Sequence, residues 1–340
     1  MRSSVAASAA AHSIGSQPLL LDAADGRRVS VGRLSIPRAR GSAARGYTAP
    51  VSVRVYVNGV ITDRDSAVIS IFDRGFLYGD SVYEVLRTSG GRSVDLDRHL
   101  DRLRRSAAAI DLAMPVSEAL GGAIAETLDA AGNPESYLRI IVTRGAGPIT
   151  LDISAPEKSS LVLIAAPLAL PAAELYERGA TIAIVGVERT SRRAFDPAVK
   201  SGNYLNNIMA LAEARRSGAY EAIMCSPDGR VAEGSTSNLF VARRGRLTTP
   251  ALATGILPGI TRLRVMEIAT AADIAADEGD LRPDDVRGAD EVFITSSIRG
   301  VMPVSAVDGR PIRDGVPGPI TRRLTELYAR FLAEVARGAA

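Results

Sequence analysis

Cysteine and lysine are both scarce in this 340-residue sequence. Cys225 is the single cysteine, so no internal disulfide can form, and a reducing, cytoplasmic location is predicted. One cysteine and two histidines that lie far apart in the sequence do not suggest a metal site of the usual nitrogen and sulfur ligands. Lysine is limited to Lys158 and Lys200 among 41 basic residues, so chemistry that needs a side-chain amine has two possible positions.

Long apolar runs are missing as well. The longest run lies near residues 161–170, is interrupted by Pro167 and is far shorter than the roughly 20 residues that a membrane helix needs. An apolar content of 46% nevertheless provides a core for one large or two ordinary domains. A fibre, a disordered chain and a disulfide-stabilised miniprotein are therefore excluded.

The formal net charge of +3 is distributed unevenly along the chain. Residues 1–50 carry +5, which leaves −2 for the remainder. The body of the protein therefore has no basic surplus of the kind that binds nucleic acid. Residues 1–50 are also rich in Ala, Ser, Gly and Arg and lack the apolar core of a secretory signal, so we predict a flexible N-terminal extension there.

The remainder is predicted to fold as two α+β domains. A hairpin is predicted at 53–61, where an alternating apolar pattern runs into Asn58-Gly59. The other predicted strands are 67–71, 82–88, 92–96, 137–144, 160–166, 181–187, 220–225, 237–242, 290–295 and 301–307. Helices are predicted after Asp95 or Asp97 and at 116–131, 203–217, 259–271 and 317–337. These elements suggest a small α/β domain at 51–165, a linker at 166–173 and a larger domain at 174–340, with ligands in the cleft between them.

Lys200 is the better placed of the two lysines. Lys158 lies in a polar segment typical of exposed loops, whereas Lys200 precedes the predicted helix at 203–217. Gly202 allows the chain to turn and another group to approach closely. Within that helix, the apolar residues Leu205, Ile208, Met209 and Ala212 recur at helical spacing and are predicted to face inward, and Gly218 is predicted to end it.

Other segments supply groups that would complement a reactive lysine. Glu233 precedes an apolar strand, and Arg102 lies at the border of a helix's apolar stripe. The helix after Pro258-Gly259 offers free backbone N–H groups and Thr261 to an anion. Each feature alone has an ordinary explanation: an exposed turn, a basic helix face or a plain helix start. Together, an amine, a carboxylate, an arginine and a phosphate cradle are what pyridoxal phosphate requires.

The chain resembles the fold-type IV pyridoxal-phosphate enzymes, which include branched-chain amino acid aminotransferases, D-amino acid aminotransferases and aminodeoxychorismate lyases. The resemblance covers about residues 52–335 and implies a two-domain fold with a small α/β domain and a larger pseudo-barrel domain. It rests on the ordered motifs FDRGFLYGDSVYEVLRT (72–88), HLDRLRRSA (99–107), YLRIIVTRG (137–145), KSGNYLNN (200–207), AEGSTSNLF (232–240), LPGITR (257–262) and the SS…PV segment (296–304).

The resemblance implies a role for each matching residue. Lys200 would be the Schiff-base lysine that also moves the substrate α-proton, Glu233 the partner of the pyridine nitrogen, and Arg102 the phosphate-binding arginine. Tyr204 resembles the tyrosine that hydrogen-bonds the cofactor's 3′ oxygen. The residues that match the phosphate cradle are Leu257, Gly259, Ile260, Thr261, Ser296 and Ser297.

The resemblance defines the substrate class less clearly than it defines the cofactor site. Tyr78, Tyr137 and Arg139 resemble substrate-carboxylate residues of branched-chain aminotransferases, whereas Arg144 resembles the carboxylate-binding arginine of D-amino acid aminotransferases. Phe76 stands where the D-specific enzymes place a tyrosine. Val85 replaces both the glycine of branched-chain enzymes and the hydroxyl residue of the lyases, which weakens the lyase interpretation.

These matches favour a transaminase that moves the amino group of an aliphatic, branched-chain L-amino acid to 2-oxoglutarate. The alternatives are an aminodeoxychorismate lyase, a D-amino acid aminotransferase and a non-catalytic cofactor-binding relic. Because Lys200, Glu233 and Arg102 are all present, catalysis is the stronger interpretation. The resemblance also implies a homodimer in which Tyr78 or the loop near Arg144 contributes to the neighbouring site.

Overall fold

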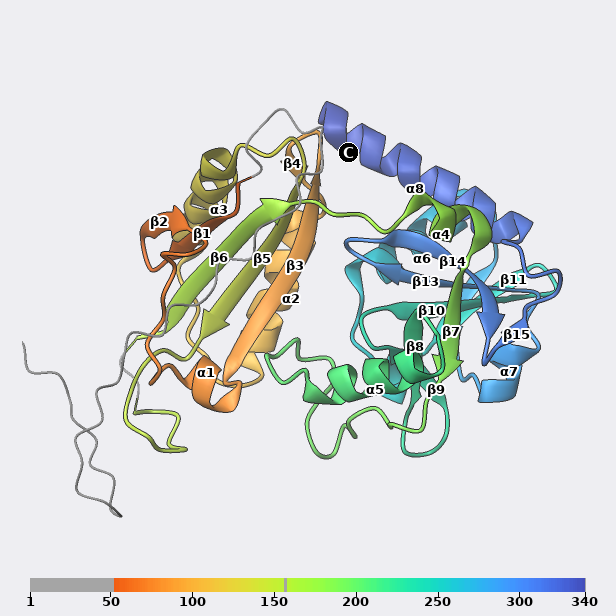
Figure 1. Cartoon of the computed structure of the whole chain (residues 1–340), viewed down its shortest axis with the longest axis horizontal. Helices are drawn as coiled ribbons and strands as arrows, with labels where there is room; N and C mark the ends of the chain where they lie inside the picture. The colour runs from red at the N-terminus through yellow and green to blue at the C-terminus, as the bar shows by residue number, and fades with distance from the viewer. Residues whose placement is uncertain (1–51, 156–157, 340) are drawn as a thin grey trace, which may run out of the picture. The chain divides into compact units, whose positions relative to one another are not determined.

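The computed structural model describes residues 52–155 and 158–339 (Figure 1), so the predicted N-terminal extension lies outside the described residues. The described chain is a mixed α+β fold, as predicted, and it is built on two separate sheets. None of the helices within these residues combines the length and the apolar character needed to cross a membrane.

The first sheet has six strands in the order β2-β1-β6-β5-β3-β4, with antiparallel neighbours. Its strands are β1 (Arg54–Val57), β2 (Val60–Asp63), β3 (Ser81–Ser89), β4 (Arg92–Ser93), β5 (Ser136–Thr143) and β6 (Ser160–Pro167). The predicted Asn58-Gly59 hairpin is confirmed, and both residues adopt positive φ angles, 49° and 104°. The strand predicted at 67–71 is wrong: these residues form a loop in which Val68 and Ile69 are exposed.

Three helices accompany this sheet: α1 (Arg74–Tyr78), α2 (Leu96–Ala108) and α3 (Ser117–Ala131). Helix α2 packs on β3, and α3 packs on β1 and β6. Strand geometry sends alternate side chains to opposite faces, so Val82, Glu84 and Leu86 lie on the same face of β3. Tyr83 and Val85 point to the other face, which α2 does not cover.

The second sheet has a principal path of strands in the order β12-β11-β10-β13-β14-β7-β8-β9, with β15 paired to β14. Its strands are β7 (Ala180–Ile184), β8 (Glu221–Cys225), β9 (Val231–Gly234), β10 (Asn238–Arg243), β11 (Arg246–Pro250), β12 (Ala276–Gly279), β13 (Glu291–Ser296), β14 (Gly300–Val307) and β15 (Arg310–Pro311). The helices of this part are α4 (Ala173–Arg178), α5 (Leu205–Arg216), η1 (Leu252–Thr254), α6 (Ile260–Ala271), α7 (Pro283–Arg287) and α8 (Pro319–Arg337).

Helix α5 exists where it was predicted, but the prediction of its buried face is wrong. Leu205, Ile208 and Met209 are 70%, 58% and 49% exposed. The helix instead packs Ala210 and Ala214 into a cluster that includes Ala183, Ala222 and Met224 of the sheet. Small side chains allow the helix backbone to approach the sheet closely, which leaves the larger apolar residues outside the core.

Candidate active site

A cavity of about 800 Å³ lies between residues of the two sheets. Its wall includes side chains from β3, β5, α2, α5, β9 and the start of α6. The predicted site residues that line it are Arg102, Tyr137, Arg139, Lys200, Tyr204, Glu233, Leu257, Gly259, Ile260, Thr261, Ser296 and Ser297. Tyr78 and Arg144 are not among the lining residues. The structure therefore brings twelve of the fourteen predicted residues together and places the other two elsewhere.

Main-chain hydrogen bonds fix the position of Lys200. Its carbonyl oxygen accepts from the Tyr83 backbone N–H at 2.9 Å, and its own N–H donates to Ser106 Oγ at 3.1 Å. Gly202 donates to the carbonyl of Ser81 at 2.9 Å. A Cβ at Gly202 would collide with the Ser81 hydroxyl, so this close pairing requires glycine. Lys200 is thereby attached to the edge of β3.

Two tyrosines surround the Lys200 amine. Lys200 Nζ lies 3.2 Å from Tyr204 Oη and 4.5 Å from the ring centroid of Tyr83. Burial and the adjacent Tyr204 raise the pKa of Tyr83. Burial alone would raise the pKa of Tyr204, but the positive charge of Lys200 together with hydrogen bonds from Tyr83 and Lys200 outweighs burial and lowers that pKa. Tyr83 therefore stays a protonated donor, while Tyr204 is suited to accept a hydrogen bond from the amine.

Glu233 lies on β9 and is almost completely buried. Its Oε1 accepts from Arg189 Nε at 2.8 Å, and its Oε2 accepts from the Leu257 N–H at 3.0 Å and from Asn238 Nδ2 at 3.3 Å. Burial raises the pKa of Glu233, and the Arg189 guanidinium is the main group that opposes the rise. A carboxylate held by three donors is oriented for one further hydrogen bond.

Arg102 is held in a buried charge cluster. Its Nε and Nη2 donate to the two oxygens of Glu84 at 2.7 and 2.8 Å, and Glu84 also contacts His99 Nδ1 at 2.7 Å. Arg102 Nη1 donates to the carbonyl of Pro258 at 2.9 Å. Burial acts against ionisation, but Arg102 lowers the pKa of Glu84 to about 2. Glu84 thus orients the arginine that lies beside the start of α6.

The start of α6 offers donors for an anion. The helix is preceded by Gly259, and no side chain caps it. Its first backbone N–H groups have no helical acceptor. A Cβ at Gly259 would collide with Asn238 Oδ1, so a larger residue here would force the Asn238 side chain to move. The hydroxyls of Ser296 and Ser297 line the same cavity, and Ser297 Oγ lies 3.5 Å from His99 Nε2.

These residues fit pyridoxal phosphate. Thr295 Oγ1 is buried and has no hydrogen-bond partner among the described residues, and Thr295 lines the cavity beside Ser296. An orphan hydroxyl in a buried site indicates a missing polar ligand. Arg102 and the start of α6 match a phosphate, Glu233 a protonated ring nitrogen and Lys200 an aldehyde. Within the part of the chain that the structure describes, no three His, Cys, Asp or Glu side chains are grouped to hold a metal ion.

The outer face of the first sheet forms a wall of the cavity. In the antiparallel register, Val85 of β3 lies opposite Arg139 of β5. The Arg139 guanidinium stacks on the Tyr83 ring, with Cζ 4.0 Å from its centroid. No acidic side chain of the described residues lies within ion-pair distance of Arg139. A cation without a counter-charge beside an apolar residue suits a ligand that carries both a carboxylate and methylene groups.

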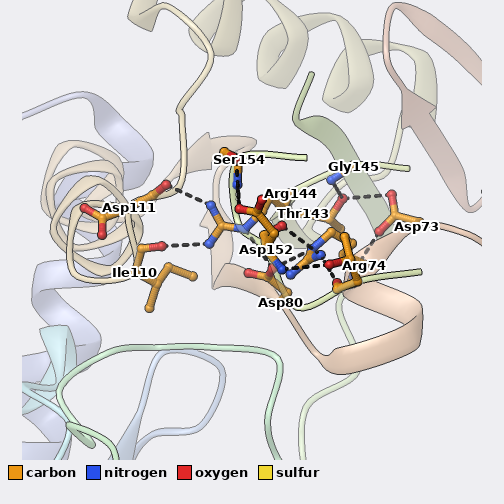
Figure 2. Close-up of polar contacts among 12 residues, drawn as sticks. Asp73, Arg74, Asp80, Ile110, Asp111, Thr143, Arg144, Gly145, Asp152 and Ser154 are labelled. Carbon is orange, nitrogen blue, oxygen red and sulfur yellow. Dashed lines mark hydrogen bonds and ion pairs between the residues drawn. The ribbon is translucent and has the colours of Figure 1, made fainter. Parts of the chain in front are cut away.

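Arg144 has a different environment from that implied by its motif. Figure 2 shows its guanidinium between Asp80 and the carbonyl groups of Ile110 and Asp111. The three contacts are 2.7 Å to Asp80 Oδ2, 2.8 Å to the Asp111 carbonyl and 2.7 Å to the Ile110 carbonyl. Arg74 Nε donates to the same Asp80 oxygen at 3.0 Å. All three nitrogens of Arg144 are therefore occupied by the protein.

Tyr78 ends helix α1 and is half-buried. Its ring lies beside Arg74, whose Cζ is 5.3 Å from the ring centroid. It does not face the cavity of its own chain.

The sequence analysis missed several residues of the site, among them Tyr83, Glu84 and Arg189. Tyr83 and Glu84 lie in the quoted 72–88 motif, so alternation along the strand could have placed them on opposite faces. Arg189 follows β7 in a segment that has no periodicity, and nothing local pairs it with a carboxylate 44 residues away. Only tertiary structure reveals that contact.

Comparisons with known proteins agree with this geometry. Residues 81–307 match the family described as Amino-transferase class IV. A Methanocaldococcus jannaschii protein, provisionally named a branched-chain-amino-acid aminotransferase, is 36% identical over 277 residues, which is 81% of this chain and 95% of that protein. The D-alanine aminotransferase of Bacillus licheniformis is 34% identical over 287 residues, 84% of this chain and 99% of that protein.

A solved structure is similar throughout the described fold. The branched-chain amino acid aminotransferase of the organism abbreviated T.th., solved with pyridoxamine 5′-phosphate, has a TM-score of 0.78 and 30% sequence identity. The similarity covers 85% of this chain and 95% of that one. The fold is thus similar to that of a protein solved with a form of the expected cofactor.

Proposed function

Because the chain belongs to the class IV aminotransferases, which depend on pyridoxal phosphate, we propose that it transfers the amino group of a branched-chain L-amino acid to 2-oxoglutarate. The products are the branched 2-oxo acid and glutamate. The observation that supports this choice is the pairing of Val85 with Arg139, which has no ion-pair partner among the described residues, on one face of the cavity. An aliphatic side chain and a γ-carboxylate must use the same pocket in turn, and this pair offers contacts to both.

Pyridoxal phosphate supplies an aldehyde carbon and an electron-accepting ring when it is bound. We propose that Arg102 and the first N–H groups of α6 hold the phosphate, and that Glu233 accepts the ring nitrogen's proton in a hydrogen bond. Thr295, Ser296 and Ser297 add hydroxyl donors in this part of the cavity.

Lys200 carries the proton transfer in this proposal. Its amine is the single lysine amine that lines the cavity, and Tyr204 orients it through the contact at 3.2 Å. The amine removes the α-proton of the donor and returns a proton to complete the transfer. Arg139 binds the γ-carboxylate of 2-oxoglutarate, while Val85, Ile208 and Leu211 line the pocket for an aliphatic side chain.

A D-amino acid, with D-alanine as the first example, is the second candidate donor. The similarity to the Bacillus licheniformis D-alanine aminotransferase favours it. The environment of Arg144 argues against it, because this side chain does not line the cavity and instead bonds to Asp80 and to two carbonyl groups. The lyase alternative receives no such support, since these relatives are named aminotransferases.

A donor screen tests the proposed function. The holoenzyme is mixed with 2-oxoglutarate and with L-leucine, L-isoleucine, L-valine or the D-enantiomers, and glutamate formation is followed. We expect the L-branched-chain donors to give the highest kcat/KM. A higher value for D-alanine would overturn the proposal in favour of the second candidate, and pyruvate release from aminodeoxychorismate would favour the lyase.

The same assay with the Arg139→Met variant tests how the enzyme binds the amino acceptor, 2-oxoglutarate. Methionine keeps an apolar contact with Tyr83 but cannot bind a carboxylate, so KM for 2-oxoglutarate is expected to rise about 10- to 100-fold. The half-reaction with L-leucine is expected to change by less than about threefold, since leucine has no second carboxylate. Equal losses with both substrates would contradict the role proposed for Arg139.

We also propose that the protein is a homodimer. Several large apolar residues are exposed on the loop before α1 and on the segment after Arg144: Ile71, Phe72, Ile149, Leu151 and Ile153. Such a surface is unusual for a monomer and suits a second copy of the same chain. Sedimentation equilibrium is expected to give twice the mass of 35.7 kDa, and a monomer at micromolar concentration would refute the proposal. A cytoplasmic location remains a prediction from the single cysteine.

A further inference from the structure

Arg189 stands out among the residues of the cavity because its guanidinium is directed at another side chain of the site. Arg189 Nε lies 2.8 Å from Glu233 Oε1, and the two side chains are 12% and 6% exposed. The pair is therefore largely shielded from water. Removing one partner of such a pair leaves an uncompensated charge in a poorly hydrated environment.

The segment that carries Arg189 does not need the guanidinium for its own fold. The Arg189 backbone N–H donates to the Cys225 carbonyl at 2.8 Å. Asn206 Nδ2 donates to the carbonyl of Glu188 at 2.8 Å, and the Thr190 N–H donates to Asn206 Oδ1 at 3.3 Å. These contacts involve main-chain atoms of the segment and remain in any Arg189 variant.

The hydrogen bonds that Glu233 already accepts show which of its oxygens can accept another one from a ligand N–H. An ionised carboxylate has about four lone-pair positions. Oε2 uses two of them for Leu257 and Asn238, and Oε1 uses one for Arg189. The position left open by the described residues is on Oε1. A ring N–H that approaches Glu233 would thus share this oxygen with the guanidinium.

We propose that Arg189 is a positioning residue that keeps Glu233 ionised and fixes the oxygen that accepts the hydrogen bond from the protonated ring nitrogen. The proposal rests on the assignment of Glu233 as the partner of the ring nitrogen. Two physical effects follow from the geometry. The positive charge of Arg189 stabilises the ionised form of Glu233, which burial disfavours. It also reduces the negative potential that the carboxylate exerts at the ring N–H.

The pKa of Glu233 is consistent with this role. Burial raises it, and the Arg189 charge is the largest opposing influence. Without Arg189 the pKa would rise further, and Glu233 would become a neutral acid at a higher pH. A neutral acid cannot stabilise a protonated ring nitrogen, so the ring would lose electron-accepting strength.

The test uses holoenzyme loaded with pyridoxal phosphate that carries the heavy nitrogen isotope in its ring, observed by nitrogen NMR. The resonance of this atom reports its protonation. Glu233→Gln serves as the reference for a ring nitrogen without an ionised partner. Arg189→Gln is expected to move the resonance from the wild-type position by at least half of the difference that Glu233→Gln produces, and to weaken cofactor retention on gel filtration.

Two further variants complete the test. Arg189→Lys keeps the charge with a different donor geometry, so its resonance is expected to lie between those of wild type and Arg189→Gln, and it provides the readout if the neutral variant does not fold. Arg192→Gln changes an arginine of the same segment that is 54% exposed and 4.0 Å from Asp196, and it is expected to leave the resonance unchanged.

Each outcome separates the inference from the proposed function. A wild-type resonance in both Arg189 variants, together with a shifted resonance in Glu233→Gln, overturns the role of Arg189 alone. A lower melting temperature of Arg189→Gln with an unmoved resonance does the same, because it reveals a purely structural contribution. An unmoved resonance in Glu233→Gln overturns the assignment of Glu233 and with it the inference. None of these results depends on which amino donor the enzyme prefers.

Discussion

Replacing Lys200 by alanine is expected to lower turnover by about a thousand-fold or more, since a positioned general base alone contributes about 100- to 10,000-fold and the amine that binds the aldehyde is lost as well. Lys200 is one of two lysines in the sequence and the one that lines the cavity. Neither Tyr204 nor Tyr83 can replace an amine as the group that binds an aldehyde. The measurement is the rate of glutamate formation from L-leucine and 2-oxoglutarate, with the visible absorbance of the bound cofactor as a second readout.

Lys158→Ala is the matched control for this prediction. Lys158 is exposed and does not line the cavity, so its loss is expected to leave the rate and the absorbance unchanged. Main-chain contacts hold residue 200 in either variant, and the fold is therefore expected to persist. Turnover that survives in Lys200→Ala would refute the central assignment of the site.

Replacing Glu84 by glutamine is expected to destabilise the apoprotein by about 3–5 kcal/mol, the range for removal of one partner of a buried ion pair. Glutamine cannot neutralise Arg102, which is 3% exposed and uses both Glu84 oxygens. Urea unfolding of the apoprotein at neutral pH measures the change. Saturating pyridoxal phosphate is expected to recover part of the loss, because a phosphate supplies a new counter-charge to Arg102.

The same cluster predicts how stability depends on pH. Burial alone would raise the pKa of Glu84, but Arg102 and, to a smaller extent, His99 together outweigh burial and lower the pKa from 4.5 to about 2 in the folded protein. A carboxylate with a lowered folded-state pKa stabilises the protein above its unfolded pKa and loses that contribution as the pH falls through the folded value. The wild type is therefore expected to lose up to about 3 kcal/mol of stability between pH 4.5 and 2 through this residue.

Glu84→Gln has no such titration and should show a shallower decline over this interval. Glu126→Gln is the control, because Glu126 is exposed on α3, and it is expected to change stability by less than about 0.5 kcal/mol. Parallel acid profiles for the wild type and Glu84→Gln would contradict the strong pairing of Glu84 in the folded state.

Local signals explain which parts of the fold were predictable. The Asn58-Gly59 turn and the end of α3 at Gly132 both place residues with positive φ where the sequence offers Asn or Gly. Strand β12 was missed because its sequence is Ala-Asp-Glu-Gly, and it forms through parallel pairing with β11. Charged and small residues have weak strand preference, so only the neighbouring strand determines this element.

The residues of the candidate site also divide into those that local sequence signals predict and those that only the tertiary structure places. Lys200, Glu233 and the start of α6 were predictable because each belongs to a motif with its own chemistry. Arg144 shows the limit of this reasoning, since a motif identifies a side chain but not its partners. Asp80 and the carbonyls of Ile110 and Asp111 bind Arg144 through contacts that no spacing rule relates to it.

The backbone attachment of Lys200 to β3 has a consequence for how such an enzyme can change its substrate. Tyr83 and Val85 project from the same strand whose main chain holds the lysine, while Val82 and Leu86 on the opposite face of that strand are anchored in the core. Exchanging one projecting side chain alters the shape of the pocket without displacing the reactive amine. The position of the reactive amine and the shape of the pocket therefore depend on different atoms of β3. For this reason, donor preference can evolve, or be engineered, one side chain at a time.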